Sequence, residues 1–233
     1  MLEKYYHKKQ EKCYIRRDDG QIDETDLNLY FELNTERELL FKPNICKHIK
    51  SPILDVGCGA GRVAQYFQDL GYKVVGIDIS KEAISIAKNL GMQDAVLGSI
   101  WDFQSEPKFE TVLLYGNNMG LAERVENIPK FLDKLFSLMN PQDGGKVICT
   151  SLIFFNTDRK VHLDYHKFKR EKGDYPGNLK LRFETDKFYN DWFEYCFIPL
   201  EDMNLVLAGT PYRIIEKHLG DVNYIAVIEK KQE

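Results

Sequence analysis

A short apolar stretch that runs into a glycine-rich turn and an amphipathic helix is the feature that most constrains the fold. Residues 53–61 read Ile-Leu-Asp-Val-Gly-Cys-Gly-Ala-Gly, and their apolar start predicts a buried strand. Apolar residues at helical spacing predict a helix over 61–70. Glycines at such a turn allow positive φ angles and the close approach of a ligand. The segment therefore predicts the floor of a pocket for a nucleotide-type ligand.

The spacing of the glycines discriminates between nucleotide ligands. In the dinucleotide fingerprint G-x-G-x-x-G the third glycine would fall at residue 62, which is Arg62. The turn instead carries Asp55, whose carboxylate suits an ammonium group and would repel a diphosphate. Asp78, at the end of the next apolar stretch, is placed to accept hydrogen bonds from ribose hydroxyls. An ammonium group, a ribose and no phosphate describe S-adenosylmethionine, with S-adenosylhomocysteine as its product.

The two motifs also carry a family resemblance. Residues 53–155 resemble the class I S-adenosylmethionine-dependent methyltransferases, because residues 53–61 match the first motif of that family and residues 76–80 match its second. The resemblance implies an α/β, Rossmann-like fold with a seven-stranded, mostly parallel sheet. It also implies a C-terminal antiparallel hairpin and a lid insertion after strand 5.

A more local resemblance, to bacterial small-molecule methyltransferases of undefined substrate, covers nearly the whole chain. It rests on an Arg-Arg-Asp-Asp-Gly run at 16–20, a Gly-Asn-Asn-x-Gly-Leu loop at 116–121 and a His-x-x-Tyr-His stretch at 162–166. The chain departs from this pattern at Glu123 and Arg124, where smaller residues are expected. The resemblance implies a lid that the N-terminus and the insertion form together.

The chain divides into an arm, a domain and an insertion. We expect an N-terminal arm or lid over 1–34, with a turn at 17–20, and a methyltransferase domain over 35–233. Within the domain, the pattern becomes irregular and polar after the fifth strand. Residues 156–198 are therefore expected to form an inserted lid or substrate region.

Alternating strand and helix patterns predict a parallel sheet with helices on both faces. The expected strands are 52–56, 73–77, 93–98, 110–115, 146–153, 179–185, 190–198, 212–218 and 222–229, and the expected helices are 61–70, 81–90, 127–139 and 199–208. A further helix is expected over 35–49, where Thr35 and Glu38 suggest a capping box and Pro43 suggests a break or kink.

Composition limits the partners and the compartment. A length of 233 residues fits one α/β domain with an insertion, and the net charge of −4 offers no bulk attraction for nucleic acid or anionic lipid. Five scattered cysteines suggest a reducing compartment without a disulfide framework or structural zinc site. With no apolar signal core or membrane-spanning run, we expect a soluble, cytoplasmic protein. We expect a small-molecule substrate, no metal, no membrane and no nucleic acid, and the oligomeric state stays open.

The family resemblance implies which residues hold the cofactor. The expected contacts are Asp55, Gly57, Cys58, Gly59, Gly61, Asp78, Ile79, Ser99, Ile100, Trp101, Tyr115 and Asn117. Among them, the glycines cradle the methionine portion with their backbone and Asp55 supports the ammonium group. Asp78 binds the ribose, Ile79 packs on the adenine, and Cys58 fills space in the turn.

The adenine contact departs from the family pattern. Ser99 stands where the family often has an acid that accepts from the adenine amino group. Either Ser99 or Asp102 could therefore make that contact. Ile100 or Trp101 could cover the adenine face, and the alternative for Trp101 is a place in the core.

The loop after the fourth strand is expected at the methyl group. Asn117 or Asn118 could hydrogen-bond the substrate or the methionine carboxylate, whereas the alternative is turn chemistry, since Asn tolerates the left-handed region. Tyr115, beside them, is a candidate catalytic residue. Amino-group methylases of nucleic acid often carry an Asn/Asp-Pro-Pro-aromatic run here, which this chain lacks. An adenine or cytosine target is therefore disfavoured.

Further candidates lie in the insertion and the arm. His162 and His166 are four residues apart and would share a helix face, as a general base, a substrate contact or a structural pair. A metal site would need a third ligand, and Asp164 would point elsewhere. Arg16 and Arg17 could bind a carboxylate or phosphate of the substrate, or pair with nearby acids. Arg16, Asn118 and His166 are the substrate-binding candidates.

These features favour a methyltransferase that acts on a small-molecule acceptor by in-line displacement, with positioning as the main source of acceleration. One alternative is a methyltransferase that acts on a protein or RNA partner, which a broad basic or apolar surface would favour. Another is a protein that binds S-adenosylmethionine without catalysis. Arg62 and Asp55 argue against a dinucleotide or nucleotide-sugar enzyme.

Overall fold

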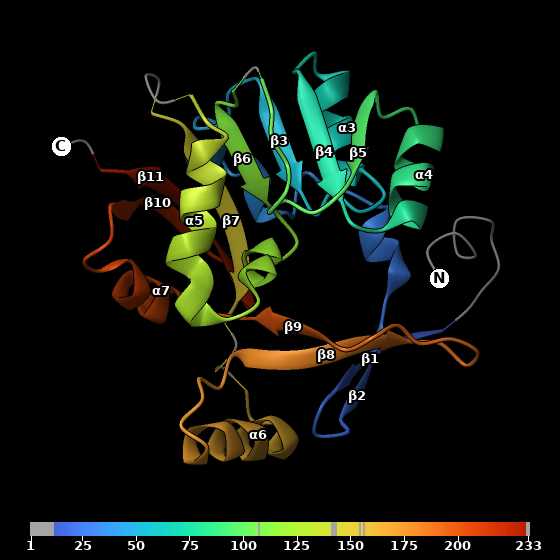
Figure 1. The fold of residues 1–233 in the computed structure, drawn as a ribbon, viewed down its shortest axis with the longest axis vertical. Helices are drawn as coiled ribbons and strands as arrows, with labels where there is room; N and C mark the ends of the chain where they lie inside the picture. The colour runs from blue at the N-terminus through green and yellow to red at the C-terminus, as the bar shows by residue number, and fades with distance from the viewer. Residues whose placement is uncertain (1–11, 107, 141–143, 154, 156, 232–233) are drawn as a thin grey trace.

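A seven-stranded sheet forms the centre of the molecule (Figure 1). The computed structural model describes residues 12–106, 108–140, 144–153, 155 and 157–231. The strand order is β10-β11-β7-β6-β3-β4-β5, in which the pairs from β7 to β5 are parallel and β11 is antiparallel to both of its neighbours. The bounds are β3 (Ile53–Val56), β4 (Val74–Asp78), β5 (Asp94–Leu97), β6 (Thr111–Leu114), β7 (Lys146–Leu152), β10 (Tyr212–Leu219) and β11 (Asn223–Lys230). The α/β class, the mostly parallel sheet and the C-terminal hairpin are confirmed.

Helices cover both faces of this sheet, as the continuous apolar strands require. The helices are α3 (Arg62–Asp69), α4 (Lys81–Asn89), α5 (Ile128–Ser137) and α7 (Leu200–Leu207). Leu54 and Val56 face the core cluster that α5 and α7 complete, whereas Ile53 faces the cluster with α3 and α4. Ser80 begins α4, because its hydroxyl accepts a hydrogen bond from the Ala83 N–H at 3.1 Å. The predicted helices differ from these by a few terminal residues.

The continuous helix predicted over 35–49 is wrong, although the break expected at Pro43 is confirmed. The chain forms a turn, a short 3-10 helix η2 (Leu39–Phe41) and a one-turn helix α2 (Pro43–Cys46). Asn34, one residue before the expected cap Thr35, caps the turn at 35–37, because its side chain accepts from the Glu36 and Arg37 N–H groups at 3.2 Å each. Pro43 lies in the first turn of α2, where its missing N–H costs nothing.

A second, four-stranded sheet joins the two segments of the predicted lid, the N-terminal arm and the insertion. Its order is β2-β1-β8-β9, all antiparallel, with β1 (Cys13–Arg17), β2 (Ile22–Thr25), β8 (Asn178–Glu184) and β9 (Phe193–Cys196). The N-terminal arm thus pairs with the insertion through β1 and β8. The predicted turn at 17–20 joins β1 to β2, with Gly20 at φ 90°. Residues 1–11 of the predicted arm lie outside the described residues.

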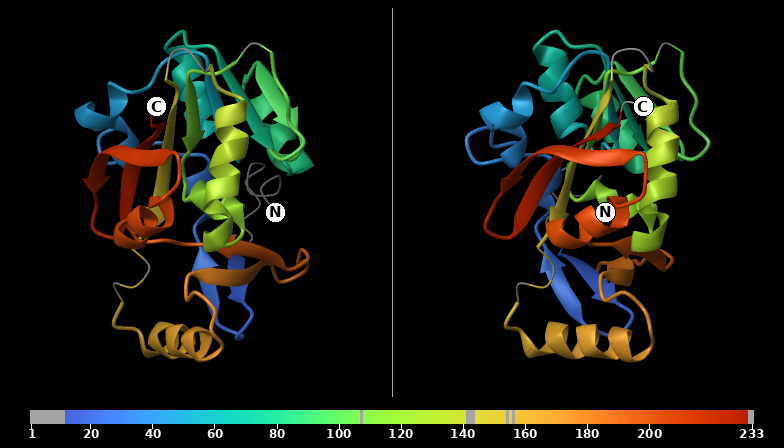
Figure 2. Two further views of the ribbon diagram at one scale, coloured as in Figure 1. Left: turned by 60° about the vertical axis from the view of Figure 1, so that its left-hand side comes forward. Right: turned by 90° about the vertical axis from the view of Figure 1, so that its left-hand side faces the viewer.

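The insertion also contains a helix that the sequence pattern did not predict. Residues 156–177 were expected to be irregular, yet α6 (Lys160–Glu171) forms within them. Only Tyr165 and His166 of this helix are buried, so its apolar periodicity is weak. In Figures 1 and 2, α6 lies at the end of the molecule farthest from the seven-stranded sheet, with the four-stranded sheet between them.

Candidate functional site

The glycine turn lies at the carboxyl ends of β3 and β4. Gly57, Gly59 and Gly61 have φ angles of 71°, 57° and 86°, which favour glycine. The Asp78 carboxylate accepts from the Gly59 N–H at 2.9 Å and from the Ser80 N–H at 2.8 Å. Asp78 therefore ties the turn to the end of the neighbouring strand.

Asp55 lies beneath this turn with only 3% of its surface exposed. Burial raises the pKa of its carboxyl group to about 7, against the opposing effects of the Arg62 guanidinium and the Ala64 N–H. A carboxylate that is poorly solvated gains most from a cationic ligand. Cys58, beside it, is also buried and packs against Gly76, where an added Cβ would lie 2.9 Å from the Cys58 Sγ.

The two asparagines after β6 have different environments. Asn118 donates its side-chain N–H groups to the Val56 and Gly57 carbonyls at 2.8 and 2.9 Å, so it braces the glycine turn. A Cβ on Gly57 would lie 2.6 Å from that same nitrogen. Asn117 is in the left-handed region with φ 69°, and its Oδ1 is buried without a hydrogen-bond partner among the described residues.

The site has features that fit S-adenosylmethionine. The unpartnered Asn117 Oδ1 is an acceptor that calls for a donor such as an ammonium or hydroxyl group. A Cβ added at Gly98, after β5, or at Gly116, after β6, would meet no protein atom within 4 Å, so both glycines border open space. The chemistry of the donor set, with Asp55 and Asp78 and no basic residue among the predicted contacts, suits that cofactor rather than a phosphate.

Only some of the predicted adenine contacts lie at the carboxyl ends of the strands, beside the glycine turn. Ile79 is 77% exposed beside Asp78, which leaves its apolar surface available to a ring. Ile100 is buried, and Trp101 packs against Phe131 of α5 with ring centroids 5.4 Å apart. The Ser99 hydroxyl accepts from the Trp101 N–H at 3.2 Å. The contact with Phe131 is the environment expected for a core aromatic.

The N-terminal arm contributes a residue that the sequence analysis missed. Tyr30 ends the 3-10 helix η1 (Leu27–Tyr30), and its Cδ1 lies 3.8 Å from the Cβ position of Gly59. Burial raises the pKa of Tyr30 to about 12, and the Cys13 thiol and the Asp78 carboxylate add to the shift. No local signal marks Tyr30 as a site residue, because it reaches the turn only through the fold of the arm.

The arm and the turn that follows it also bind the start of α3. Arg62 pairs with Glu38 at 2.7 Å and donates to the Glu32 carbonyl at 3.0 Å. Burial raises the pKa of Tyr115, and its hydrogen bond with the Glu38 carboxylate adds to the shift. Tyr115 thus stays protonated near neutral pH, which makes it a poor general base.

The insertion reaches the same edge through Tyr195 of β9, which the sequence analysis also missed. The Tyr195 hydroxyl donates to the Asn117 carbonyl at 2.7 Å. Its ring lies against Gly120, where an added Cβ would be 2.2 Å from the ring. Gly120 therefore allows β9 to approach the loop after β6.

The candidates on α6 are not brought to the glycine turn. His162 Nδ1 lies 3.1 Å from Arg17 Nη1, and burial together with Arg159 and Arg17 lowers the pKa of His162. His166 is buried against Phe155, and burial, Arg170 and His162 lower its pKa to about 4. A histidine with that pKa is neutral and weakly basic near pH 7.

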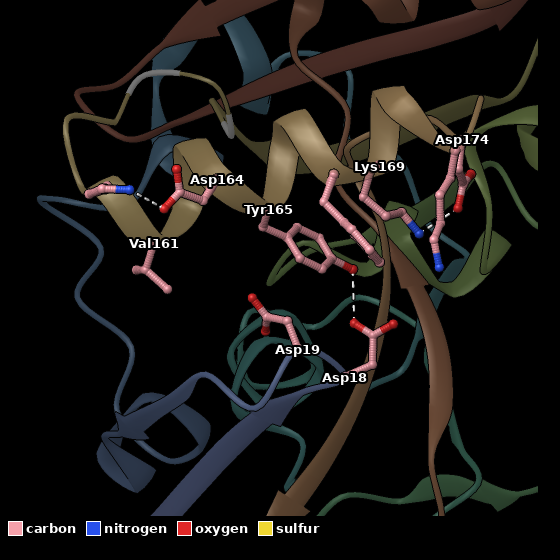
Figure 3. Close-up of a pocket in the computed structure, with 10 residues that line it drawn as sticks. Asp18, Asp19, Val161, Asp164, Tyr165, Lys169 and Asp174 are labelled. Atoms are coloured by element: carbon pink, nitrogen blue, oxygen red, sulfur yellow. Dashed lines mark hydrogen bonds and ion pairs between the residues drawn. The ribbon is translucent and has the colours of Figure 1, made fainter.

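A cavity of about 1050 Å³ lies between α6 and the turn from β1 to β2 (Figure 3). Tyr165 donates its hydroxyl to Asp18 at 3.0 Å there. The Arg17 guanidinium lies 4.0 Å from the Tyr165 ring. The lining residues, all within the described part of the chain, include none of the predicted cofactor contacts. Arg16 points to the opposite face of β1, where it pairs with Glu184 at 2.7 Å.

In residues 12–231, apart from the undescribed gaps, no group of three His, Cys, Asp or Glu side chains could hold a metal ion. No described helix is long and apolar enough to cross a membrane.

Comparisons with known proteins agree with this geometry. A family model described as a methyltransferase domain matches residues 33–181. Ubiquinone biosynthesis O-methyltransferase of Nitrobacter winogradskyi is 31% identical over 106 residues, which are 43% of this chain and 38% of that protein. The enzyme of the same name from Nitrosococcus oceani is 28% identical over 163 residues, which are 59% of this chain and 67% of that protein.

A solved structure shares the fold over nearly the whole chain. It is an S-adenosylmethionine-dependent methyltransferase from Bacteroides fragilis in complex with S-adenosyl-L-homocysteine, with a TM-score of 0.79, 22% identity and coverage of 99% of this chain and 93% of that one. The chain spans only 36% to 42% of the length of the first five curated relatives that it matches.

Proposed function

Because this chain belongs to the class I S-adenosylmethionine-dependent methyltransferases, we propose that it transfers a methyl group to a small-molecule acceptor. The observation that carries the proposal is the glycine turn, held to β4 by Asp78 with the buried Asp55 beneath it. S-adenosylmethionine, when bound, supplies a methyl group on a positive sulfonium, which is activated for displacement.

The residues of the turn would divide the work of binding. Asp55 would face the ammonium group, the backbone of the turn would hold the methionine portion, and Asp78 would accept from the ribose hydroxyls. Ile79 would pack on the adenine, and Asn117 would offer its unpartnered oxygen to a donor. The acceleration would come from positioning an acceptor in line with the methyl group, because the described residues at the turn include no strong base.

The elements that surround the glycine turn favour a small acceptor. Tyr30 from the arm lies over Gly59, and Tyr195 from the insertion contacts the loop after β6. We propose that the arm, residues 1–34, and the insertion, residues 156–198, form a lid that excludes water and bulky partners. The curated relatives named ubiquinone biosynthesis O-methyltransferases also support a small-molecule acceptor.

Calorimetry with S-adenosylhomocysteine tests the proposal. Asp78→Ala removes the carboxylate that binds the ribose and holds Gly59, so we expect cofactor affinity to fall roughly 10- to 100-fold. Asp94→Ala is the matched control, because it removes an exposed carboxylate at the opposite end of the neighbouring strand β5. Equal affinities of the wild type and the Asp78 variant, with unchanged circular dichroism, would reject the assignment of the site.

A further inference from the structure

Two residues of the loop after β6 have backbone conformations that residues other than glycine rarely adopt. Asn117 and Glu123 both have φ 69°, and among the residues that the structure describes they are the only non-glycine residues with positive φ. They directly precede and follow the 3-10 helix η3 (Asn118–Ala122). Glu123, with ψ −49°, is the centre of a γ-turn in which the Arg124 N–H donates to the Ala122 carbonyl at 2.8 Å. Because this type of γ-turn is rare and strained, contacts from elsewhere must hold it.

Those contacts come from the insertion, through Asn178 at the start of β8. Asn178 is buried, with 2% of its surface exposed, and its Oδ1 accepts from the Val125 N–H at 2.8 Å. Its Nδ2 donates to the carboxylates of Glu126 and Asp174, at 3.1 and 3.0 Å. The Arg124 guanidinium donates to the same two carboxylates, at 2.6 and 2.8 Å. The two residues that follow the γ-turn are therefore tied to the insertion, one by its backbone and one by its side chain.

The loop held in this way braces the glycine turn. Asn118, the first residue of η3, donates its amide N–H groups to the Val56 and Gly57 carbonyls. Asn117, just before it, carries the buried Oδ1 that has no partner among the described residues. In the proposed site the glycine turn holds the methionine portion of the cofactor, whereas Asp78 at the end of β4 binds the ribose. Since β3 separates β6 from β4 in the sheet, the loop after β6 should act on the methionine portion.

We infer that Asn178 is a positioning residue, which imposes the γ-turn at Glu123 and so holds the loop after β6 in the shape that binds the methionine portion. The inference rests on the proposed function, which supplies the ligand. It also gives a role to Glu123 and Arg124, where the chain departs from the bacterial methyltransferases that it resembles. Arg124 pairs with the same carboxylates as Asn178, and an exposed glutamate is tolerated at the γ-turn because these contacts fix the residues after it.

Calorimetry with two ligands tests the inference. S-adenosylhomocysteine carries an amino acid portion with an ammonium group, whereas 5′-methylthioadenosine carries the adenosine and lacks that portion. Asn178→Ala leaves the Val125 N–H unpaired and frees the γ-turn, so S-adenosylhomocysteine should bind roughly three- to tenfold more weakly. Binding of 5′-methylthioadenosine should not change.

Thr111→Val is the matched control. Thr111 is buried at the opposite end of β6, where its hydroxyl exchanges two hydrogen bonds of 2.8 Å with the Lys50 backbone. The control should lower the melting temperature, as Asn178→Ala should, because both remove buried hydrogen bonds. It should leave the affinities for both ligands unchanged.

A second substitution separates positioning from a loss of stability. Glycine adopts positive φ without strain, and the Glu123 side chain is exposed. Glu123→Gly, added to Asn178→Ala, should therefore restore part of the affinity for S-adenosylhomocysteine. The inference is overturned if Asn178→Ala weakens both ligands alike or neither of them, or if Glu123→Gly restores nothing.

A wild type that binds neither ligand would instead contradict the proposed function. Amide exchange of residues 118–122 in the free protein then decides the inference by itself. Exchange there should be faster in the Asn178→Ala variant than in the Thr111→Val variant. Equal rates in the two variants would overturn the positioning role.

Discussion

At the scale of single residues, Asp55 should make cofactor binding depend on pH. Its pKa is about 7 in the folded protein, because burial opposes the charged form, against an ordinary value of 3.8. A cationic ammonium group favours the ionised carboxylate, so binding should release a proton below pH 7. Affinity for S-adenosylhomocysteine should therefore rise with pH up to about 7 and level off above it.

Calorimetry between pH 5.5 and 8, in buffers of different ionisation enthalpy, measures both the affinity and the proton release. Asp55→Asn should bind more weakly and lose the pH dependence. Since the folded protein holds the Asp55 proton longer than the unfolded chain, the free energy of unfolding of the free protein should fall as pH rises from about 4 to 7. If affinity and the free energy of unfolding depend on pH in the Asp55→Asn variant as they do in the wild type, both expectations are contradicted.

Asn118 should act on the cofactor through the glycine turn. Its amide satisfies the carbonyls of Val56 and Gly57, so Asn118→Ala leaves both acceptors unpaired. We expect the free energy of unfolding to fall by about 1–3 kcal/mol and cofactor affinity to fall with it. Urea unfolding and calorimetry measure the two effects. Asn44→Ala removes a single, more exposed amide-to-carbonyl bond of 3.3 Å to Lys217, away from the glycine turn, and should leave affinity unchanged.

At the scale of elements, Arg17 should hold α6 against the N-terminal hairpin. Its guanidinium pairs with Asp19 at 2.6 Å, stacks on Tyr165 and contacts His162. Arg17→Ala should therefore speed amide exchange in α6 roughly 10- to 100-fold, with no change in the seven-stranded sheet. The neighbour Arg16 makes a more exposed ion pair on the other face, so Arg16→Ala should have little effect. Equal exchange rates in the two variants would contradict this role.

The sequence predicts elements well where burial imposes a period, and poorly elsewhere. The strands and helices of the seven-stranded sheet follow from apolar patterns, and the glycine turn follows from its motif. In contrast, α6 buries only two side chains, so its sequence carries little helical periodicity. The strands β1 and β2 depend on pairing with β8, a contact between distant segments that local patterns cannot report.

At the scale of the whole molecule, local sequence patterns cannot report contacts between distant segments, which explains why two residues near the glycine turn were missed. Asp55, Asp78 and Asn118 meet because consecutive parallel strands end at one edge of a sheet, which the topology of the fold predicts. Tyr30 and Tyr195 reach that edge from opposite ends of the chain, through the four-stranded sheet. Their contacts depend on tertiary pairing, so no motif marks them.

Because the arm, with Tyr30, and the insertion, with Tyr195, both reach this edge of the sheet, we expect both to respond to the cofactor. If the arm and the insertion form a lid, S-adenosylhomocysteine should slow amide exchange in η1 and β9 together with the glycine turn, because Tyr30 and Tyr195 contact the turn and its neighbouring loop. The antiparallel pair β10 and β11, at the far edge of the sheet, should not respond. Tyr195→Phe keeps the ring but loses the hydrogen bond to Asn117, and should reduce the protection in β9 alone. Protection confined to the glycine turn would show that neither segment closes over the cofactor.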